Sequence, residues 1–124
     1  MGKILLVDDD QQIRRVVRLM LANLGHSVVE AVDGNDALQA FSSIRPDVTL
    51  LDLQMPRKNG FEILADLRAS WPTAPVVIMT GSYSSDEQLV ELLVKDAHVV
   101  HLSKPFVGDQ LSNAVRTALA TGGS

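Results

Sequence analysis

Short, mainly hydrophobic runs recur along the chain, and longer stretches of mixed polarity separate them. Three of these runs occupy residues 4–7, 48–51 and 76–79. Runs of this length and composition are typical of strands that a parallel sheet buries on both faces. Two further segments, SVVEAV at 27–32 and HVVHL at 98–102, are more polar, and we interpret them as strands at the edges of the sheet.

The stretches between these runs carry hydrophobic residues at helical spacing. In the first stretch, apolar side chains recur every three or four residues from Ile13 to Leu24, and Gly25 is placed to end the helix. Ser84 and Glu87 have the spacing of a capping box, which predicts the start of another helix. That helix is predicted to begin directly after Ser84 and to run through Leu93, and further helices are predicted over residues 37–44, 61–67 and 111–119.

Strand and helix alternate five times along the chain. This alternation predicts an α/β fold with a parallel sheet and right-handed crossover connections. A length of 124 residues fits one domain, and we find no internal repeat.

Composition narrows the class of protein. The absence of cysteine excludes disulfides, thiolate metal sites and cysteine nucleophiles, and it suits a reducing compartment. A formal net charge of −4 argues against direct nucleic-acid binding through a basic surface. No apolar run approaches the roughly 18 residues of a membrane span, and the N-terminus lacks a signal-peptide pattern. We therefore expect a cytoplasmic protein.

Polar residues follow four of the predicted strands. Asp8 and Asp9 follow the first strand, Asp52 the third, Thr80 the fourth and Lys104 the fifth. Strands often end in polar residues because loops are solvated, which would account for any one of these positions. In an open parallel sheet, however, sites form beyond the carboxyl ends of the strands, so we expect these side chains to meet. Three acids, a hydroxyl and an ammonium group together indicate a functional site.

Carboxylates that cluster without histidine or cysteine suit a hard cation. Mg²⁺ binds one or two carboxylates, keeps several waters and commonly bridges to a phosphate oxygen. A bound cation would leave one carboxylate free to attack phosphorus. Lys104 could then neutralise an added phosphoryl group, and Thr80 could donate a hydrogen bond to it.

Four segments of the chain together resemble the receiver domains of two-component response regulators, which belong to the CheY-like superfamily. These segments are ILLVDDD, VTLLDLQMPRKNG, VVIMTG and LSKPF, in this order, and the resemblance extends over residues 3–120. It implies a flavodoxin-like (βα)5 three-layer sandwich with parallel strand order 2-1-3-4-5. It also implies one receiver domain over residues 1–120, and the small, polar residues at 121–124 are expected to form a flexible tail.

The resemblance assigns roles to the acidic residues. Asp52 would accept a phosphoryl group from a phosphohistidine of a sensor histidine kinase or histidine phosphotransfer protein. Asp9 and Asp52 would bind Mg²⁺ (or Mn²⁺) directly, and Asp8 would bind it through water. The backbone carbonyl of Gln54 would supply a further metal ligand.

The resemblance also identifies the residues around the phosphoryl group. Thr80 corresponds to the switch hydroxyl, and Lys104 to the phosphate-binding lysine. The bond to Pro105 would be cis, and Gly81 would leave access to the site open. His101 stands where receivers usually have tyrosine or phenylalanine. It therefore either alters the switch, for example by a response to pH, or is an edge-strand histidine without a switching role.

Several residues of the first predicted helix have plainer interpretations. Asp10 is an acid favoured by the helix dipole at the N-terminus, and we do not expect it to bind metal. Arg14, Arg15 and Arg18 are interpreted as a solvated helix face, with docking of the phosphodonor as the alternative.

The resemblance implies a switch rather than an enzyme, since only self-catalysed transfer and autodephosphorylation are expected. Phosphorylation would shift the face formed by the fourth helix, fifth strand and fifth helix, which would control a downstream effector or an output domain. We expect a monomer that could dimerise on phosphorylation.

Other functions stay open as alternatives. A degenerate receiver would act only as a protein-docking module. A hydrolase with an aspartyl-phosphate intermediate would have an acid two residues after the nucleophile, where this chain has Gln54. Nucleotide binding is disfavoured because no predicted strand leads into a glycine-rich phosphate loop.

Overall fold

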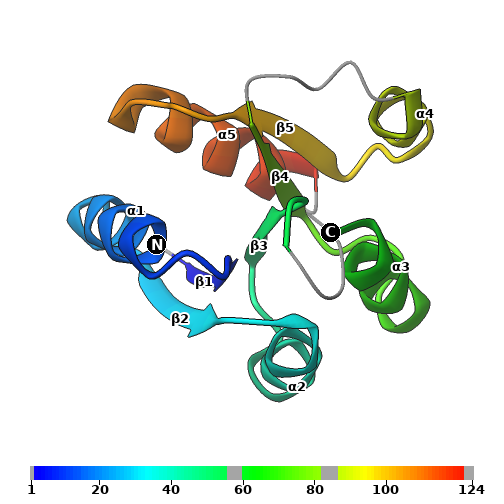
Figure 1. Cartoon of the computed structure of the whole chain (residues 1–124), viewed down its shortest axis with the longest axis horizontal. Helices are drawn as coiled ribbons and strands as arrows, with labels where there is room; N and C mark the ends of the chain where they lie inside the picture. Colours follow the sequence, from blue (N-terminus) through cyan, green and yellow to red (C-terminus); the bar gives the residue numbers. More distant parts are fainter. Residues whose placement is uncertain (1, 56–59, 82–86, 122–124) are drawn as a thin grey trace.

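The computed structural model describes residues 2–55, 60–81 and 87–121. Within these ranges, strands and helices alternate as the sequence predicts (Figure 1). The strands are Lys3–Val7 (β1), Ser27–Ala31 (β2), Val48–Asp52 (β3), Val76–Thr80 (β4) and Val99–Ser103 (β5). The helices are Gln11–Asn23 (α1), Gly34–Ile44 (α2), Gly60–Ser70 (α3), Glu87–Lys95 (α4) and Gly108–Thr121 (α5). None of these helices is long and apolar enough to cross a membrane.

All strand pairs are parallel, and the strand order is β2-β1-β3-β4-β5. The predicted flavodoxin-like α/β fold is therefore confirmed, with the two more polar strands at the edges. The register aligns the carboxyl ends of the inner strands. Val7 pairs with Leu51, and Asp52 pairs with Met79. Thr80 pairs with Ser103, the residue before Lys104.

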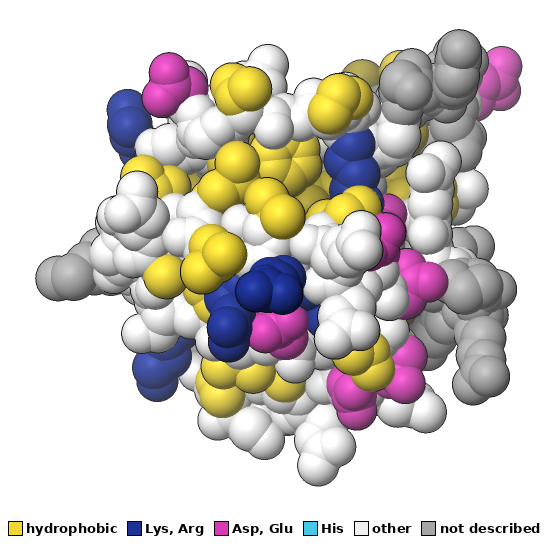
Figure 2. Space-filling model, turned by 60° about the vertical axis from the view of Figure 1, so that its left-hand side comes forward, with side chains coloured by type: hydrophobic (Ala, Val, Ile, Leu, Met, Phe, Trp, Pro, Cys, Tyr) yellow, Lys and Arg dark blue, Asp and Glu magenta, His cyan; other side chains and the backbone are white. Residues whose placement is uncertain are grey.

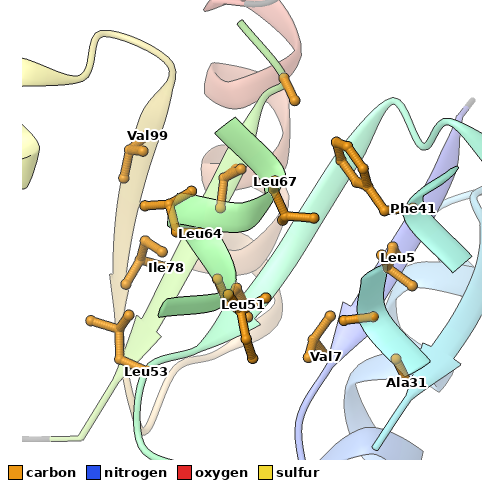
Figure 3. Packing of buried hydrophobic residues seen from close by; sticks show 14 of the residues in the cluster. Leu5, Val7, Ala31, Phe41, Leu51, Leu53, Leu64, Leu67, Ile78 and Val99 are labelled. Atoms are coloured by element: carbon orange, nitrogen blue, oxygen red, sulfur yellow. The ribbon is translucent and has the colours of Figure 1, made fainter. Parts of the chain in front are cut away.

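The helices cover both faces of the sheet. One hydrophobic cluster joins α1 and α5 to the sheet through residues such as Val17, Leu21, Leu111 and Val115. The second cluster lies under α2, α3 and α4, and Figure 3 shows how Phe41, Leu64 and Leu67 point toward strand residues such as Leu51 and Ile78. Because β3 and β4 are fully buried between the two helical layers, their long hydrophobic runs were readable as strands.

The helix ends carry the expected signals. The side chain of Asp10 caps α1, since its carboxylate accepts hydrogen bonds from the N–H groups of Gln12 and Ile13. Gly25 follows the C-terminus of the same helix with a positive φ of 92°. The predicted capping residue Ser84 lies outside the described residues. Helix α5 includes Thr121, so the residue at which the flexible tail was predicted to begin is helical.

Candidate functional site

Three aspartates meet at the carboxyl edge of the sheet. Asp8 and Asp9 directly follow β1, and Asp52 is the last residue of the neighbouring strand β3. One carboxylate oxygen from each of the three lies within 4.8 Å of the others. Asp8 and Asp52 are buried, with exposed fractions of 0% and 4%, whereas Asp9 is exposed. The cluster therefore has two buried acids and one that opens to solvent.

Lys104 places the opposite charge against the two buried acids. Its Nζ lies 3.1 Å from Oδ2 of Asp8 and 3.4 Å from Oδ2 of Asp52. The backbone N–H of Lys104 donates to the carbonyl of Thr80 over 2.6 Å, which ties the loop after β5 to the end of β4. The peptide bond between Lys104 and Pro105 is cis, as the resemblance implied.

The buried position of Asp52 changes its acidity. Burial raises the pKa of the Asp52 carboxyl above its usual range, and the charge of Asp8 raises it further. A hydrogen bond of 2.9 Å from the N–H of Gln54 and the ammonium group of Lys104 oppose this rise, but burial prevails. Two of the three acids thus share the ammonium group of Lys104, and the site has an excess of negative charge.

A hard divalent cation fits this donor set. The cluster offers carboxylate oxygens, and its excess negative charge would be offset by a cation that also lowers the pKa of Asp52. The predicted ligands Asp8, Asp9 and Asp52 are therefore brought together. The fourth predicted ligand is the backbone carbonyl of Gln54. The N–H group of the same residue donates a hydrogen bond to Asp52, but the role of the carbonyl as a metal ligand stays a prediction.

Arg14 braces the turn that carries the acids. Its Nη1 donates a hydrogen bond of 2.8 Å to the backbone carbonyl of Asp8, and its Nε lies 3.1 Å from Oε1 of Glu30 on β2. Only 12% of its side chain is exposed. The interpretation of Arg14 as part of a solvated face is therefore wrong, while Arg15 and Arg18 are exposed as expected. Helical periodicity missed this contact because it does not show that the side chain reaches back over the preceding turn.

Thr80 and His101 are hydrogen-bonded to each other. Thr80 Oγ1 lies 2.6 Å from Nε2 of His101, and Thr80 is buried with an exposed fraction of 3%. Burial also lowers the pKa of His101 below its usual value. The residue that replaces the usual aromatic ring is thus in direct contact with the predicted switch hydroxyl.

The site opens onto a groove of about 540 Å³ between α1 and the loop after β5. Gly81 and Lys104 line its end nearest the acids, and Ile13, Val16 and Phe106 are among its apolar lining residues. Figure 2 views the side of the molecule that carries α1 and β2, where hydrophobic side chains gather beside basic groups around an acidic one. Of the residues at the site, Lys104 and Gly81 therefore line a groove that runs along α1.

Little space is available beside Gly81, at the same end of the groove. A Cβ atom added to Gly81 would lie 3.0 Å from Oε1 of Gln54, which is closer than most real Cβ contacts. Glycine therefore leaves room for the Gln54 amide, and the role of Gly81 in access to the site stays a prediction.

Comparisons with known proteins agree with this geometry. A family model described as the response regulator receiver domain matches residues 4–116. The response regulator MprA of Mycolicibacterium vanbaalenii is 37% identical over 118 residues, which are 94% of this chain and 50% of that protein. The MprA protein of Mycobacterium avium has the same identity and coverage. This chain therefore spans about half the length of the curated relatives it matches.

Solved structures show the same likeness in three dimensions. A response regulator receiver domain protein from Clostridium thermocellum superposes with a TM-score of 0.86 at 29% identity, over 97% of this chain and 95% of its own. The chemotaxis protein CheY4 of Vibrio cholerae gives a TM-score of 0.86 at 30% identity, over 95% of this chain and 98% of its own. Together with the family match and the acidic cluster opposite Lys104, these similarities show that the chain belongs to the receiver domains of two-component response regulators.

Proposed function

We propose that this chain is a magnesium-dependent phosphoacceptor switch in which Asp52 takes the phosphoryl group. The observation that carries the proposal is the position of the Lys104 ammonium between the buried carboxylates of Asp8 and Asp52, next to the open acid Asp9. This arrangement offers a nucleophile, a counter-charge and a cation site at one sheet edge. A docking module without phosphoryl chemistry would have no need of two buried acids there, because buried charges are costly.

The transfer step follows from these positions. An Oδ atom of Asp52 forms a bond to phosphorus, and the phosphorus–nitrogen bond of a donor phosphohistidine breaks, with its electron pair returning to the imidazole. Asp9 and Asp52 would hold Mg²⁺, with Asp8 acting through water and the carbonyl of Gln54 as a further ligand. When bound, Mg²⁺ would supply positive charge that offsets the negative charge of the acids and of the incoming phosphoryl group.

The chain's own side chains complete the charge balance. Lys104 can exchange its contact with Asp52 for a phosphoryl oxygen, because it already lies 3.4 Å from that carboxylate. Thr80, at the end of the next strand, would donate its hydroxyl proton to the same group once a phosphoryl oxygen is present. The protein would act on itself only, so it is a switch and not a turnover enzyme.

The groove along α1 is the surface we propose for the phosphodonor, a sensor histidine kinase or histidine phosphotransfer protein. It leads from apolar side chains of α1 to Lys104 and Gly81 at the site. A donor helix laid against Ile13 and Val16 would therefore bring its phosphohistidine to Asp52. The downstream effector or output domain would bind the face formed by α4, β5 and α5.

Intact mass spectrometry tests the proposal. The wild type and Asp52→Asn are incubated with acetyl phosphate, each with Mg²⁺ and with excess chelator. We expect one added phosphoryl group in the wild type with Mg²⁺ and none in the other three samples. An adduct that persists in Asp52→Asn would contradict the assignment of the acceptor. No adduct in any sample, and no beryllofluoride binding, would favour the docking module.

A further inference from the structure

The contact between Thr80 and His101 joins the phosphoryl site to a titratable group. Their side chains lie 2.6 Å apart, between Oγ1 and Nε2. Both residues project from the sheet face covered by α2, α3 and α4, because Ile78 and Val99, two residues earlier on each strand, belong to that hydrophobic cluster. The bond therefore lies on the sheet face that these helices cover, where it is partly buried.

The number of protons on the Thr80 hydroxyl and the His101 imidazole decides which of them can donate in this hydrogen bond. A hydroxyl has one proton to donate, and it can accept bonds at its oxygen. A neutral imidazole carries a proton on one nitrogen only, whereas the imidazolium carries one on each. Because burial lowers the pKa of His101, the ring is neutral around pH 7. Only one of the two groups then donates in this bond.

We propose that His101 is a positioning residue of the phosphoryl site, and that its protonation decides where the Thr80 hydroxyl proton is directed. In the neutral state, Thr80 donates to Nε2 of His101. In the protonated state, Nε2–H donates to Oγ1 of Thr80, and the hydroxyl proton becomes available for a phosphoryl oxygen on Asp52. This inference rests on the proposed function, because it assumes that Asp52 carries the phosphoryl group.

The pKa of His101 depends mainly on its burial and on its hydrogen bond to Thr80, as the groups around it show. Helices α4 and α5 both pack against β5. His101 at the sheet edge also lines a hollow between β5 and α5, whose other polar lining residues are uncharged, namely Ser103, Gln110, Asn113 and Thr117. On α4 the charged residues of the described segment are Glu87, Glu91 and Lys95. Glu91 and Lys95 pair with each other at 4.0 Å. On the β4 side, Asp52 and Lys104 lie at the phosphoryl site beyond Thr80.

The proton and the phosphoryl group should therefore favour each other's binding. By linkage, a ligand that takes the Thr80 proton raises the pKa of His101. The added affinity is fully present below the pKa of the free protein, and it is lost as the pH rises through the pKa of the complex. We expect a change of about fivefold in affinity, which is the value of one ordinary hydrogen bond.

The experiment measures the dissociation constant of beryllofluoride, a phosphoryl mimic, in the presence of Mg²⁺ from about pH 5.5 to pH 8.5. The proteins are the wild type, His101→Phe and the control His98→Gln, which changes a histidine directly before β5. Dividing the wild-type constant by that of His101→Phe at each pH cancels effects common to both, including protonation of Asp52. We expect this ratio to favour the wild type by about fivefold more at low pH than at high pH. His98→Gln should follow the wild type.

Nitrogen NMR of the imidazole rings tests the same idea in the free protein. We expect the neutral ring of His101 to carry its proton on Nδ1, and this tautomer to lose population in Thr80→Val. A neutral ring protonated on Nε2 would overturn the inference. Identical pH profiles for the wild type and His101→Phe would also overturn it while leaving the proposed function intact. If no variant binds beryllofluoride with Mg²⁺, the proposed function fails, and the tautomer still decides the direction of the Thr80 bond.

Discussion

Replacing Asp52 by asparagine should stabilise the metal-free protein. At an effective dielectric constant of about 20, the repulsion between Asp52 and Asp8, within 4.8 Å, is about 3.5 kcal/mol, and the attraction to Lys104 at 3.4 Å is about 5 kcal/mol. These nearly cancel, so the cost of burying the Asp52 charge decides the sign. The amide oxygen of asparagine can still accept the N–H of Gln54. We expect Asp52→Asn to raise the free energy of unfolding by about 1–3 kcal/mol.

Urea unfolding followed by Trp71 fluorescence measures this effect. Trp71 is the only tryptophan and contacts Phe41 and the guanidinium of Arg45, so its emission reports the folded state. Mg²⁺ should reverse the order of stability, because a ligand stabilises the state that binds it. The wild type should gain stability with Mg²⁺, and Asp52→Asn should gain far less.

The pH dependence gives a second readout of the same variant. Because the pKa of Asp52 is raised in the folded protein, its charge destabilises the fold above that pKa, and this penalty disappears as the pH falls toward the unfolded value. The stability advantage of Asp52→Asn should therefore shrink on mild acidification. The exposed control Asp36→Asn should change stability by no more than about 0.5 kcal/mol. A metal-free Asp52→Asn protein that is less stable than the wild type would refute the reasoning.

Three further predictions concern other residues. Arg14→Met should weaken Mg²⁺ binding by about fivefold, because one hydrogen bond to the Asp8 carbonyl is lost. Calorimetry measures this affinity, and an unchanged value would show that the turn keeps its shape without Arg14. Thr49→Val should raise the urea midpoint by a stability gain of about 1 kcal/mol, because the buried Oγ1 has no hydrogen-bond partner among the described residues; a lower midpoint would contradict this. Gly81→Ala should slow phosphorylation by acetyl phosphate in the intact-mass assay, because its Cβ would press on the Gln54 amide, and an unchanged rate would show that the amide moves aside freely.

The fold could be read from the sequence because each element carries its own local pattern. The runs at β3 and β4 are hydrophobic throughout because helices cover both faces of these strands, and the more polar segments at β2 and β5 lie at the edges. The helix ends followed local chemistry at Asp10 and Gly25. Strand ends differ from the predicted bounds by one residue and helix ends by up to three, since backbone hydrogen bonding and not side-chain polarity decides where an element ends.

The sequence predicted which residues form the site, but it did not predict which of their atoms are in contact. Asp8, Asp9, Asp52, Thr80 and Lys104 were recognisable because the carboxyl ends of parallel strands share one edge. Their charges and order along the chain indicated a cation site, and the resemblance to receiver domains added the prediction of phosphoryl transfer. Which carboxylates are buried, and that Lys104 contacts both Asp8 and Asp52, depended on the register of the strands.

The sequence alone therefore determined the order of elements, the two-sided burial of the inner strands and the kinds of chemical group at the sheet edge. Only the tertiary structure decided that Arg14 turns back to the Asp8 carbonyl and that His101 bonds the hydroxyl of Thr80. The physical reason is one of range. Periodicity and capping act between residues a few positions apart, whereas these contacts depend on angles and distances that exist only after the elements have packed.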